Sequence, residues 1–471
     1  MSEDDSDDSY DDASTESEVD SDSEMDTSSS AIISTTTSSD SVGGYFRGRP
    51  PGRGRGARVR GGRIVSSHNA QPSDKKRKRI QSTESRYKWE KTPNTSEQFP
   101  FQSDPGLTIS MPVDASPTDF AKLFFTDQLR QNLVRETNNY AHKVIDASRP
   151  LRRNSAMNRW KDVTLAEMDT FLGIILHMGL VGMPSYRHYW KNDPQFKNEF
   201  VRKAMSRNRF LDIMRFWHFG DNDIATDRVS KVRFWTDHLN DTMRSIYVPS
   251  KNLSLDESMM LWRGRLIFRQ YIKNKRHKYG IKFYELCQYD GIVLRVSIYS
   301  GQSYDDPHGL GQSGAIVNHL MSDFFDKGYS LYADNYYNSV PLAKYLTVRQ
   351  TYICGTLRAD RVDNPKEVTK AKLKKGDFVW SRSKDVVVAK WKDKRDVLTI
   401  SNKHTEPKLV PVTNRRGDEK LKPDSVRDYN LYMSGIDRTD QMLSYHSALR
   451  KTIRWYKKVG VHMMEMYIAG A

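Results

Sequence analysis

Three aspartates lie where the direction of the chain is expected to change. Asp256 lies in a strand-like run that begins at Ser254, Asp334 ends a later strand-like run, and Asp437 lies at the start of a late helical segment. In mixed α/β sheets, ligands gather at strand ends. Three converging carboxylates repel one another unless a cation lies among them, and such hard oxygen ligands suit Mg²⁺ or Mn²⁺.

Two such ions about 4 Å apart can activate an attacking oxygen and stabilise a leaving oxygen in phosphoryl transfer. Asp440 follows Asp437 by three positions, so on a helix the two carboxylates would share a face. The chain contains 59 acidic residues, and three of them taken arbitrarily would be ordinary surface residues. Residue type and spacing alone therefore leave a metal site and a solvated surface as open interpretations.

A cationic stretch with interleaved aromatics follows Asp256. Its basic residues are Arg263, Arg265, Arg269, Lys273, Lys275, Arg276 and Lys278, and its aromatic residues are Trp262, Phe268, Tyr271 and Tyr279. Arginine and lysine hold phosphates, and aromatic rings stack on flipped or single-stranded bases. The stretch predicts a DNA-binding groove, with a solvated surface whose aromatics face the core as the alternative.

Hydrophobic periodicity indicates the elements that position these groups. Residues 99–250 repeat apolar side chains at helical spacings, and Thr164 with Glu167 forms a capping-box pattern, so this part is expected to be mostly α-helical. From residue 251 the pattern predicts the order β-β-β-α-β-α-β, which is typical of a mixed sheet with flanking helices. Residues 360–425 interrupt that order and are interpreted as an insertion.

Charge is segregated along the chain, whose 75 Lys and Arg and 59 Asp and Glu give a net charge of +16. Residues 1–44 hold 14 acids and no base, which predicts a disordered tail that either solubilises the protein or mimics DNA phosphates. Residues 45–117 are expected to be a disordered segment that opens with an Arg-Gly-rich tract suited to loose nucleic-acid contact. A nuclear-import signal is predicted from the basic run Lys75, Lys76, Arg77, Lys78 and Arg79.

Cysteine content and hydropathy exclude several classes of protein. Only Cys287 and Cys354 are present, so a disulfide framework and a cysteine-rich zinc module are excluded, and a reducing compartment is expected. The longest apolar run, residues 171–183, is too short to cross a bilayer, and the acidic N-terminus fits no secretory signal. We therefore expect no membrane association and a polyanionic partner, with nucleic acid the first candidate.

Several long motifs, in order, resemble the piggyBac family of DDE transposases over roughly residues 118–467. Around the acids these are Leu255-Asp256-Glu257-Ser258, Ala333-Asp334-Asn335-Tyr336-Tyr337 and Gly435-Ile436-Asp437-Arg438-Thr439-Asp440. The basic stretch from Phe268 to Lys282 resembles the family as well. So do Met205-Ser206-Arg207-Asn208-Arg209-Phe210 and Trp391-Lys392-Asp393-Lys394-Arg395.

The resemblance implies an RNase H-like catalytic domain that binds two Mg²⁺ or Mn²⁺ ions through Asp256, Asp334 and Asp437, with Asp440 as a supporting acid. It also implies DNA hydrolysis and strand transfer with insertion at TTAA. A helical domain for dimerisation and DNA binding is expected at 118–250, completed by 445–471. The catalytic domain is expected at 251–444, in a nuclear homodimer that binds transposon ends.

Two interpretations of the catalytic activity stay open. Members of the family often end in a cysteine-rich zinc module, and this chain contains none and ends at Ala471 within the last matching helix. The protein is therefore expected to be either a DDE transposase or a truncated or domesticated derivative. Such a derivative would bind DNA or chromatin without catalysis.

A glycine pattern offers a different class of function. Gly309, Gly311 and Gly314 match the spacing of a dinucleotide-binding motif. That motif requires the glycines to turn directly off a strand, whereas residues 305–308 separate them from the preceding strand. We interpret the pattern as a loop before a helix, and a nicotinamide-dependent oxidoreductase is the weak alternative.

Overall fold

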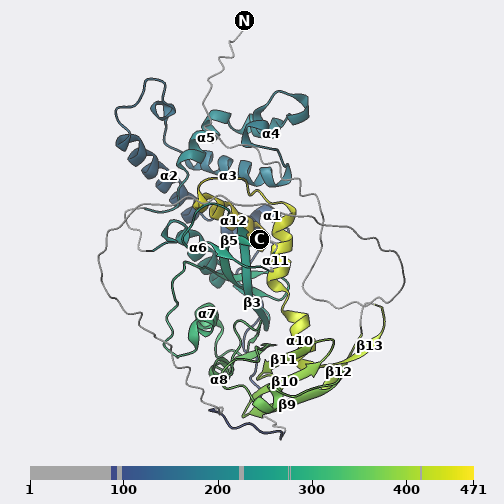
Figure 1. Cartoon of the computed structure of the whole chain (residues 1–471). Coiled ribbons are helices and arrows are strands. Elements are labelled where there is room, and N and C mark those ends of the chain that lie inside the picture. The colour runs from purple at the N-terminus through teal and green to yellow at the C-terminus, as the bar shows by residue number, and fades with distance from the viewer. Residues whose placement is uncertain (1–85, 93–97, 222–226, 274, 276, 414–415) are drawn as a thin grey trace, which may run out of the picture. The chain divides into compact units, whose positions relative to one another are not determined.

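A computed structural model describes residues 86–92, 98–221, 227–273, 275, 277–413 and 416–471 (Figure 1). The described residues all belong to one compact unit, Arg79–Ala471. The predicted acidic tail, the Arg-Gly tract, the import run Lys75–Arg79 and Arg276 lie outside the described residues.

The first half of this unit is helical, as the periodicity predicted. Its helices are α1 (Pro117–Phe124), α2 (Asp127–Ala147), α3 (Leu165–Leu180), α4 (Glu199–Ala204), α5 (Arg207–Phe216) and α6 (Ser230–Ile246). The short helices η1 (Ala156–Arg159), η2 (Tyr186–Trp190) and η3 (Pro194–Phe196) join them, and β1 (Gly106–Leu107) pairs with β2 (Tyr247–Val248). The capping box of α3 is confirmed, because the Thr164 hydroxyl accepts from the Glu167 N–H and the Glu167 carboxylate accepts from the Thr164 N–H.

The second half is built on a nine-stranded mixed sheet. Its strands are β3 (Asn252–Leu261), β4 (Gln270–Tyr271), β5 (Tyr279–Gln288), β6 (Val293–Ile298), β7 (Ser330–Ala333), β8 (Tyr352–Thr356), β9 (Phe378–Ser383), β10 (Val386–Lys392) and β11 (Asp396–Ser401). Their order is β4-β5-β3-β7-β8-β11-β10-β9, and β6 pairs with β5 beyond the residues that pair with β4.

The predicted order β-β-β-α-β-α-β is present in β3, β5, β6, α7 (Gly311–Met321), β7, α8 (Val340–Val348) and β8. β3 pairs antiparallel with β5, whereas β3 with β7 and β7 with β8 are parallel. Parallel neighbours need a crossover connection, which α8 supplies between β7 and β8. The mixed sheet with flanking helices that the sequence predicted is therefore observed, and the short helix η4 (Ser322–Phe324) follows α7.

The region interpreted as an insertion, 360–425, contributes strands to the same sheet. It contains α9 (Lys366–Thr369) and β9 to β11, and β11 pairs antiparallel with β8. A separate hairpin of β12 (Leu409–Thr413) and β13 (Glu419–Pro423) follows, then α10 (Asp424–Tyr432). The central sheet thus continues through residues that break the helix–strand alternation of the sequence.

Two C-terminal helices cover the sheet and join it to the helical half. α11 (Gly435–Tyr445) packs against β3 and β5, and α12 (Trp455–Gly470) packs against α1, α3 and α6 (Figure 1). Gly460 of α12 allows this close packing, because a Cβ there would lie 2.5 Å from the Phe219 ring. Among the described residues, no helix has the length and apolar character required to span a bilayer.

Candidate active site

Asp256 and Asp334 come from neighbouring parallel strands. The parallel register of β3 and β7 ends with the pair Leu255 and Ala333. Asp256 directly follows Leu255, and Asp334 directly follows Ala333. Residues in register on adjacent strands point to the same face of a sheet. The topology therefore brings these two predicted site residues together at the carboxyl end of the strand pair.

The turn after β7 holds Asp334 in place through local hydrogen bonds. The Asp334 carboxylate accepts from the Tyr336 N–H at 2.8 Å. The buried Asn338 side chain donates to the Ala333 carbonyl and to the Thr356 carbonyl, each at 2.8 Å, and so ties the ends of β7 and β8 together. The Asp-Asn-Tyr-Tyr-Asn run after the strand is thus a hydrogen-bonded turn that fixes one carboxylate.

α11 brings the other two acids to the sheet. Gly435 begins this helix in close contact with β3 and β5, and the Thr439 hydroxyl donates to the Gly291 carbonyl at 2.6 Å. Asp437 and Asp440, three positions apart on the docked helix, lie on the same side of it as predicted. Asp437 is exposed and Asp440 is half-buried.

Lys275 supplies a positive charge among these acids. Its ammonium lies 3.6 Å from the Asp256 carboxylate and donates to the Glu257 carbonyl at 2.6 Å. Burial lowers the pKa of Lys275, but the charges of Asp256, Asp437 and Asp440 raise it by more, so the pKa lies above its ordinary value. The same ammonium also acts on Asp334. One lysine therefore interacts with all four predicted site carboxylates.

Burial makes the ionised state of these carboxyls costly. Desolvation raises the pKa of Asp334, and it raises the pKa of Asp256 well above the usual range, with the neighbouring Glu257 adding to the effect. Burial likewise raises the pKa of Asp440 to about 6. Each of these groups would be stabilised in its charged form by a cation placed beside it.

The donor set has the chemistry that a hard divalent cation prefers, because every candidate ligand is a carboxylate oxygen. Across the residues that the structure describes, however, no three His, Cys, Asp or Glu side chains form a group that could hold a metal ion. Lys275 holds the compensating charge instead. The residues therefore suit Mg²⁺ or Mn²⁺ by chemical type, whereas the described side chains are not arranged as a metal site, and Lys275 is the competing cation beside Asp256.

A second, fully buried polar layer lies behind the acids and was not predicted from the sequence. Glu285 on β5 is opposite Asp256 in the antiparallel register and accepts a hydrogen bond from the Ser258 hydroxyl. Burial, with the charge of Asp440, raises the pKa of Glu285 to about 7. His462 of α12 is also buried and acts electrostatically on both Glu285 and Asp440. The available sequence signal was Glu285 itself, an acid in an otherwise apolar run of the strand.

The basic stretch after Asp256 divides into exposed and structural residues. Trp262 and Phe268 are buried, whereas Tyr271 and Tyr279 are half exposed with ring centroids 4.7 Å apart. Arg269 donates to the Arg263 and Gly264 carbonyls at 2.8 and 3.2 Å, so its guanidinium supports the loop. The remaining described cations with exposed side chains are Arg263, Arg265, Lys273 and Lys278.

The glycine pattern does not form a phosphate cradle. The Asp306 carboxylate accepts from the N–H groups of Leu310 and Gly311 at 2.8 and 2.7 Å, at the start of α7. These are the amides that would bind a dinucleotide phosphate. An internal carboxylate thus occupies the position, which agrees with a loop before a helix.

Replacing Lys275 by Met is expected to raise the affinity for Mn²⁺ by roughly 10-fold, because about 1.4 kcal/mol of competing charge would be removed. Titration followed by the electron paramagnetic resonance signal of free Mn²⁺ measures this directly, without DNA and without activity. Lys278→Met, an exposed lysine three positions later, is the matched control. An unchanged or weaker Mn²⁺ affinity in Lys275→Met would show that Lys275 does not compete with metal.

The fold and the candidate site define a mixed α/β protein with carboxylates gathered at the end of two adjacent parallel strands and on a helix docked beside them. A family model described as Transposase IS4 matches residues 116–471. The chain belongs to the piggyBac family of DDE transposases.

Individual relatives agree with this assignment. The chain is 26% identical over 377 residues to human PiggyBac transposable element-derived protein 3, covering 76% of this chain and 61% of that protein. It is 26% identical over 373 residues to human PiggyBac transposable element-derived protein 2, covering 75% and 60%. The chain thus spans about three fifths of the length of these curated relatives.

A solved structure has the same fold. It is the cryo-EM structure of a piggyBac transposase synaptic complex with hairpin DNA, which matches with a TM-score of 0.66 at 25% identity. The match covers 78% of this chain and 76% of the solved one.

Proposed function

We propose that the protein is a DDE transposase whose central sheet is an RNase H-like catalytic domain. The observation that carries the proposal is the position of Asp256 and Asp334 at the end of two paired parallel strands, with α11, which carries Asp437 and Asp440, packed against β3. Asp256, Asp334 and Asp437 would hold two Mg²⁺ or Mn²⁺ ions, and Asp440 would support them. When bound, such ions lower the pKa of an attacking oxygen and stabilise the leaving oxygen of a phosphodiester.

The residues of the chain have separable tasks in this proposal. The Asn338 hydrogen bonds orient the turn that carries Asp334, and the docking of α11 sets the position of Asp437. The buried Glu285 lies beside Asp256 in the register of β3 and β5 and is held by the Ser258 hydroxyl. Because these supports are hydrogen-bonded or close-packed, the carboxylates are held before substrate arrives.

DNA is the proposed substrate, as transposon ends and as a TTAA target. The matching solved structure is described as a synaptic complex with hairpin DNA, which supports DNA as the partner of this chain too. The exposed Arg263 and Arg265 follow the end of β3 in the chain. A nuclear homodimer remains part of the proposal, with the run Lys75–Arg79 as its import signal.

A domesticated DNA- or chromatin-binding derivative is the second candidate. Two observations favour it: Lys275 already compensates the carboxylates, and the human relatives carry names that mark them as derived from a transposable element. Such a protein would bind DNA through the same basic surface and leave it intact.

Cleavage of DNA with TTAA-flanked ends separates the two candidates. The full chain is incubated with labelled DNA in Mg²⁺, in Mn²⁺ and in EDTA, and products are resolved on a denaturing gel. Metal-dependent nicks at the TTAA boundary support the transposase. Binding at full strength with intact DNA in both metals supports the domesticated derivative.

Replacing Arg265 by Ala is expected to reduce the slope of log affinity against log salt by close to one unit, since each lost phosphate contact removes about 0.9. Arg265 and Arg269 are both exposed, but the Arg269 guanidinium is hydrogen-bonded to carbonyls of its own loop. Fluorescence anisotropy of a labelled duplex at several salt concentrations measures the slope. Lys372→Ala removes the same charge from an exposed position before the edge strand β9, and a slope equal in both variants would refute the contact.

A further inference from the structure

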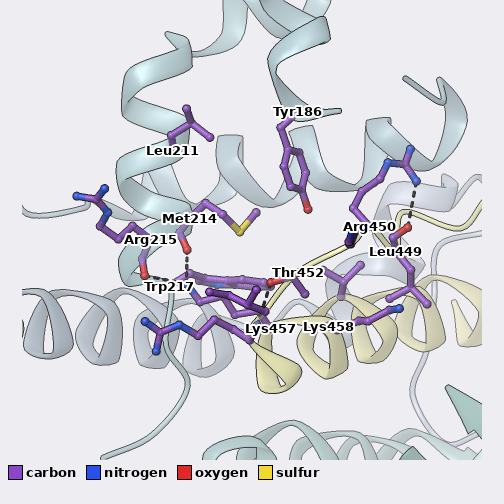
Figure 2. A pocket seen from close by; sticks show the side chains of 14 residues that line it. Tyr186, Leu211, Met214, Arg215, Trp217, Leu449, Arg450, Thr452, Lys457 and Lys458 are labelled. Carbon is purple, nitrogen blue, oxygen red and sulfur yellow. Dashed lines mark hydrogen bonds between the residues drawn. The ribbon is translucent and has the colours of Figure 1, made fainter. Parts of the chain in front are cut away.

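A pocket of about 290 Å³ lies between α5, the chain segment 449–454 and the first turns of α12. Figure 2 shows Leu211, Met214 and Arg215 of α5 on one side and Lys457 and Lys458 of α12 on the other, with Tyr186 directed toward the space between them. It is separate from the candidate active site, since none of the four site carboxylates lines it.

Every charged residue that lines this pocket is positive. The six are Arg215, Arg450, Lys451, Arg454, Lys457 and Lys458. In the described part of the chain none of them forms a salt bridge. Arg209 of the same helix, in contrast, is paired with Glu167 at 2.8 Å. The pocket therefore concentrates positive charge, with no acidic residue among the described residues that line it.

Three of the six cations are fixed by neutral acceptors. The buried Lys457 ammonium donates to the Met214 carbonyl and, at 2.8 Å, to the Arg215 carbonyl (Figure 2). Lys458 donates to the Leu261 carbonyl at 2.8 Å, and Arg450 donates to the Met178 carbonyl. Carbonyl oxygens satisfy the hydrogen-bonding demand of these groups but leave their charges uncompensated.

The other three cations are exposed around the pocket. Arg215, Lys451 and Arg454 have exposed side chains. Burial, followed by the charges of Arg454 and Arg215, lowers the pKa of Lys457 to about 7. Burial and Arg454 also lower the pKa of Lys231. Glu465 acts on Lys458, but it does not line the pocket. A positive local potential of this kind favours a bound anion.

The lining between the cations is apolar. Leu211, Met214, Trp217, Leu449 and Val461 contribute aliphatic or aromatic surface, and Tyr186 contributes a largely buried ring. A free inorganic anion needs no apolar wall. A nucleotide presents both a phosphate for the cations and a flat apolar base for the wall. The volume is close to the lower limit of about 300 Å³ for small-molecule sites, which suits one such unit.

We propose that this pocket binds one unpaired nucleotide of DNA, with its phosphate on Lys451 and Arg454 and its base against Met214 and Tyr186. The identity of the ligand as DNA rests on the proposed function, whereas the pocket and its charge do not. The site would anchor an extruded base away from the catalytic carboxylates. It would give the protein a preference for distorted or hairpin DNA over a continuous duplex.

The test compares binding of three DNA hairpins that differ at one position. One has a single unpaired adenine in its stem, one has an abasic site there, and one is fully paired. Anisotropy is measured in EDTA with the full chain carrying Asp334→Asn, so cleavage plays no part. The background protein is expected to bind the unpaired adenine roughly 10-fold more tightly than the other two, because stacking of one base is worth about 1–3 kcal/mol.

Lys451→Ala with Arg454→Ala is expected to remove that preference while the melting temperature is unchanged, since both side chains are exposed. Lys372→Ala with Lys375→Ala removes equal charge from an exposed loop and should keep the preference. Equal affinity of the background protein for the adenine and abasic hairpins would overturn the proposal. So would an equal loss of the adenine preference in both double variants. If the unsubstituted chain leaves DNA intact in both Mg²⁺ and Mn²⁺ while the preference for the unpaired adenine is present, the pocket is supported and only the proposed catalytic function is refuted.

Discussion

Replacing Asp334 by Asn is expected to lower metal-dependent DNA cleavage by roughly 1000-fold, because about 4 kcal/mol of stabilisation by the bound ions would be lost. The amide oxygen of Asn can still accept from the Tyr336 N–H, so the turn after β7 is retained. What changes is the negative charge beside Asp256. Single-turnover rates in Mg²⁺, measured with enzyme in excess over a TTAA-flanked substrate, report the effect on chemistry.

The same variant should fold at least as well as the parent protein. Burial raises the pKa of Asp334, so the folded state favours the neutral form of this side chain, and a neutral amide avoids the cost of burying a charge. The melting temperature in EDTA is therefore expected to be equal or higher. Asp114→Asn makes the same chemical change at an exposed position and should leave both rate and melting temperature unaltered. An unchanged cleavage rate in Asp334→Asn would show that Asp334 is not part of the active site.

The placement of Asp256 and Asp334 on strand-like runs could be predicted because it depends on local signals, whereas their convergence depends on the distant pairing of β3 with β7. Asp256 lies within a short apolar run and Asp334 directly follows another, and both runs form strands. The position of Asp437 at the start of a helix followed from periodicity in the same way. These inferences needed no knowledge of which distant segments touch.

The surroundings of the acids depend on contacts that periodicity does not encode. Lys275 was predicted as a DNA contact, yet the loop between β4 and β5 turns its ammonium toward Asp256. The buried layer requires α12, more than 170 positions after Glu285, to place His462 over β5. The extension of the sheet by β9 to β11 depends on pairing with β8, which is equally non-local.

The burial of the aromatic residues and the convergence of the basic residues could not be predicted from the sequence either. Basic and aromatic residues alternate in the basic stretch, and this pattern does not distinguish the buried Trp262 and Phe268 from the exposed Tyr271 and Tyr279. The sequence does contain five cations without an acid at 450–458. Their convergence with Arg215 becomes visible only when α5 and α12 are packed together.

Replacing Gly435 by Ala is expected to disable the site from a position that carries no functional group. A Cβ at Gly435 would lie 2.2 Å from the Ser254 hydroxyl and 2.6 Å from the Gln288 carbonyl, so α11 would have to move away from β3 and β5. Overpacking of this kind costs about 1–3 kcal/mol. Since Asp437 and Asp440 are carried by the same helix, metal-dependent cleavage should fall along with the melting temperature.

Gly173→Ala provides the matched control, because both substitutions add one methyl group to a helical glycine. Gly173 lies on the exposed side of α3, and a Cβ there meets nothing within 4 Å. This variant should be more stable than the parent by about 0.5–1 kcal/mol, since alanine loses less backbone entropy in a helix. Thermal unfolding and cleavage rates of the two variants, measured side by side, separate the general effect of a methyl group from the docking of α11. If Gly435→Ala matched Gly173→Ala in both measurements, the acids would not depend on that docking, and the position of Asp437 beside β3 would lose its structural basis.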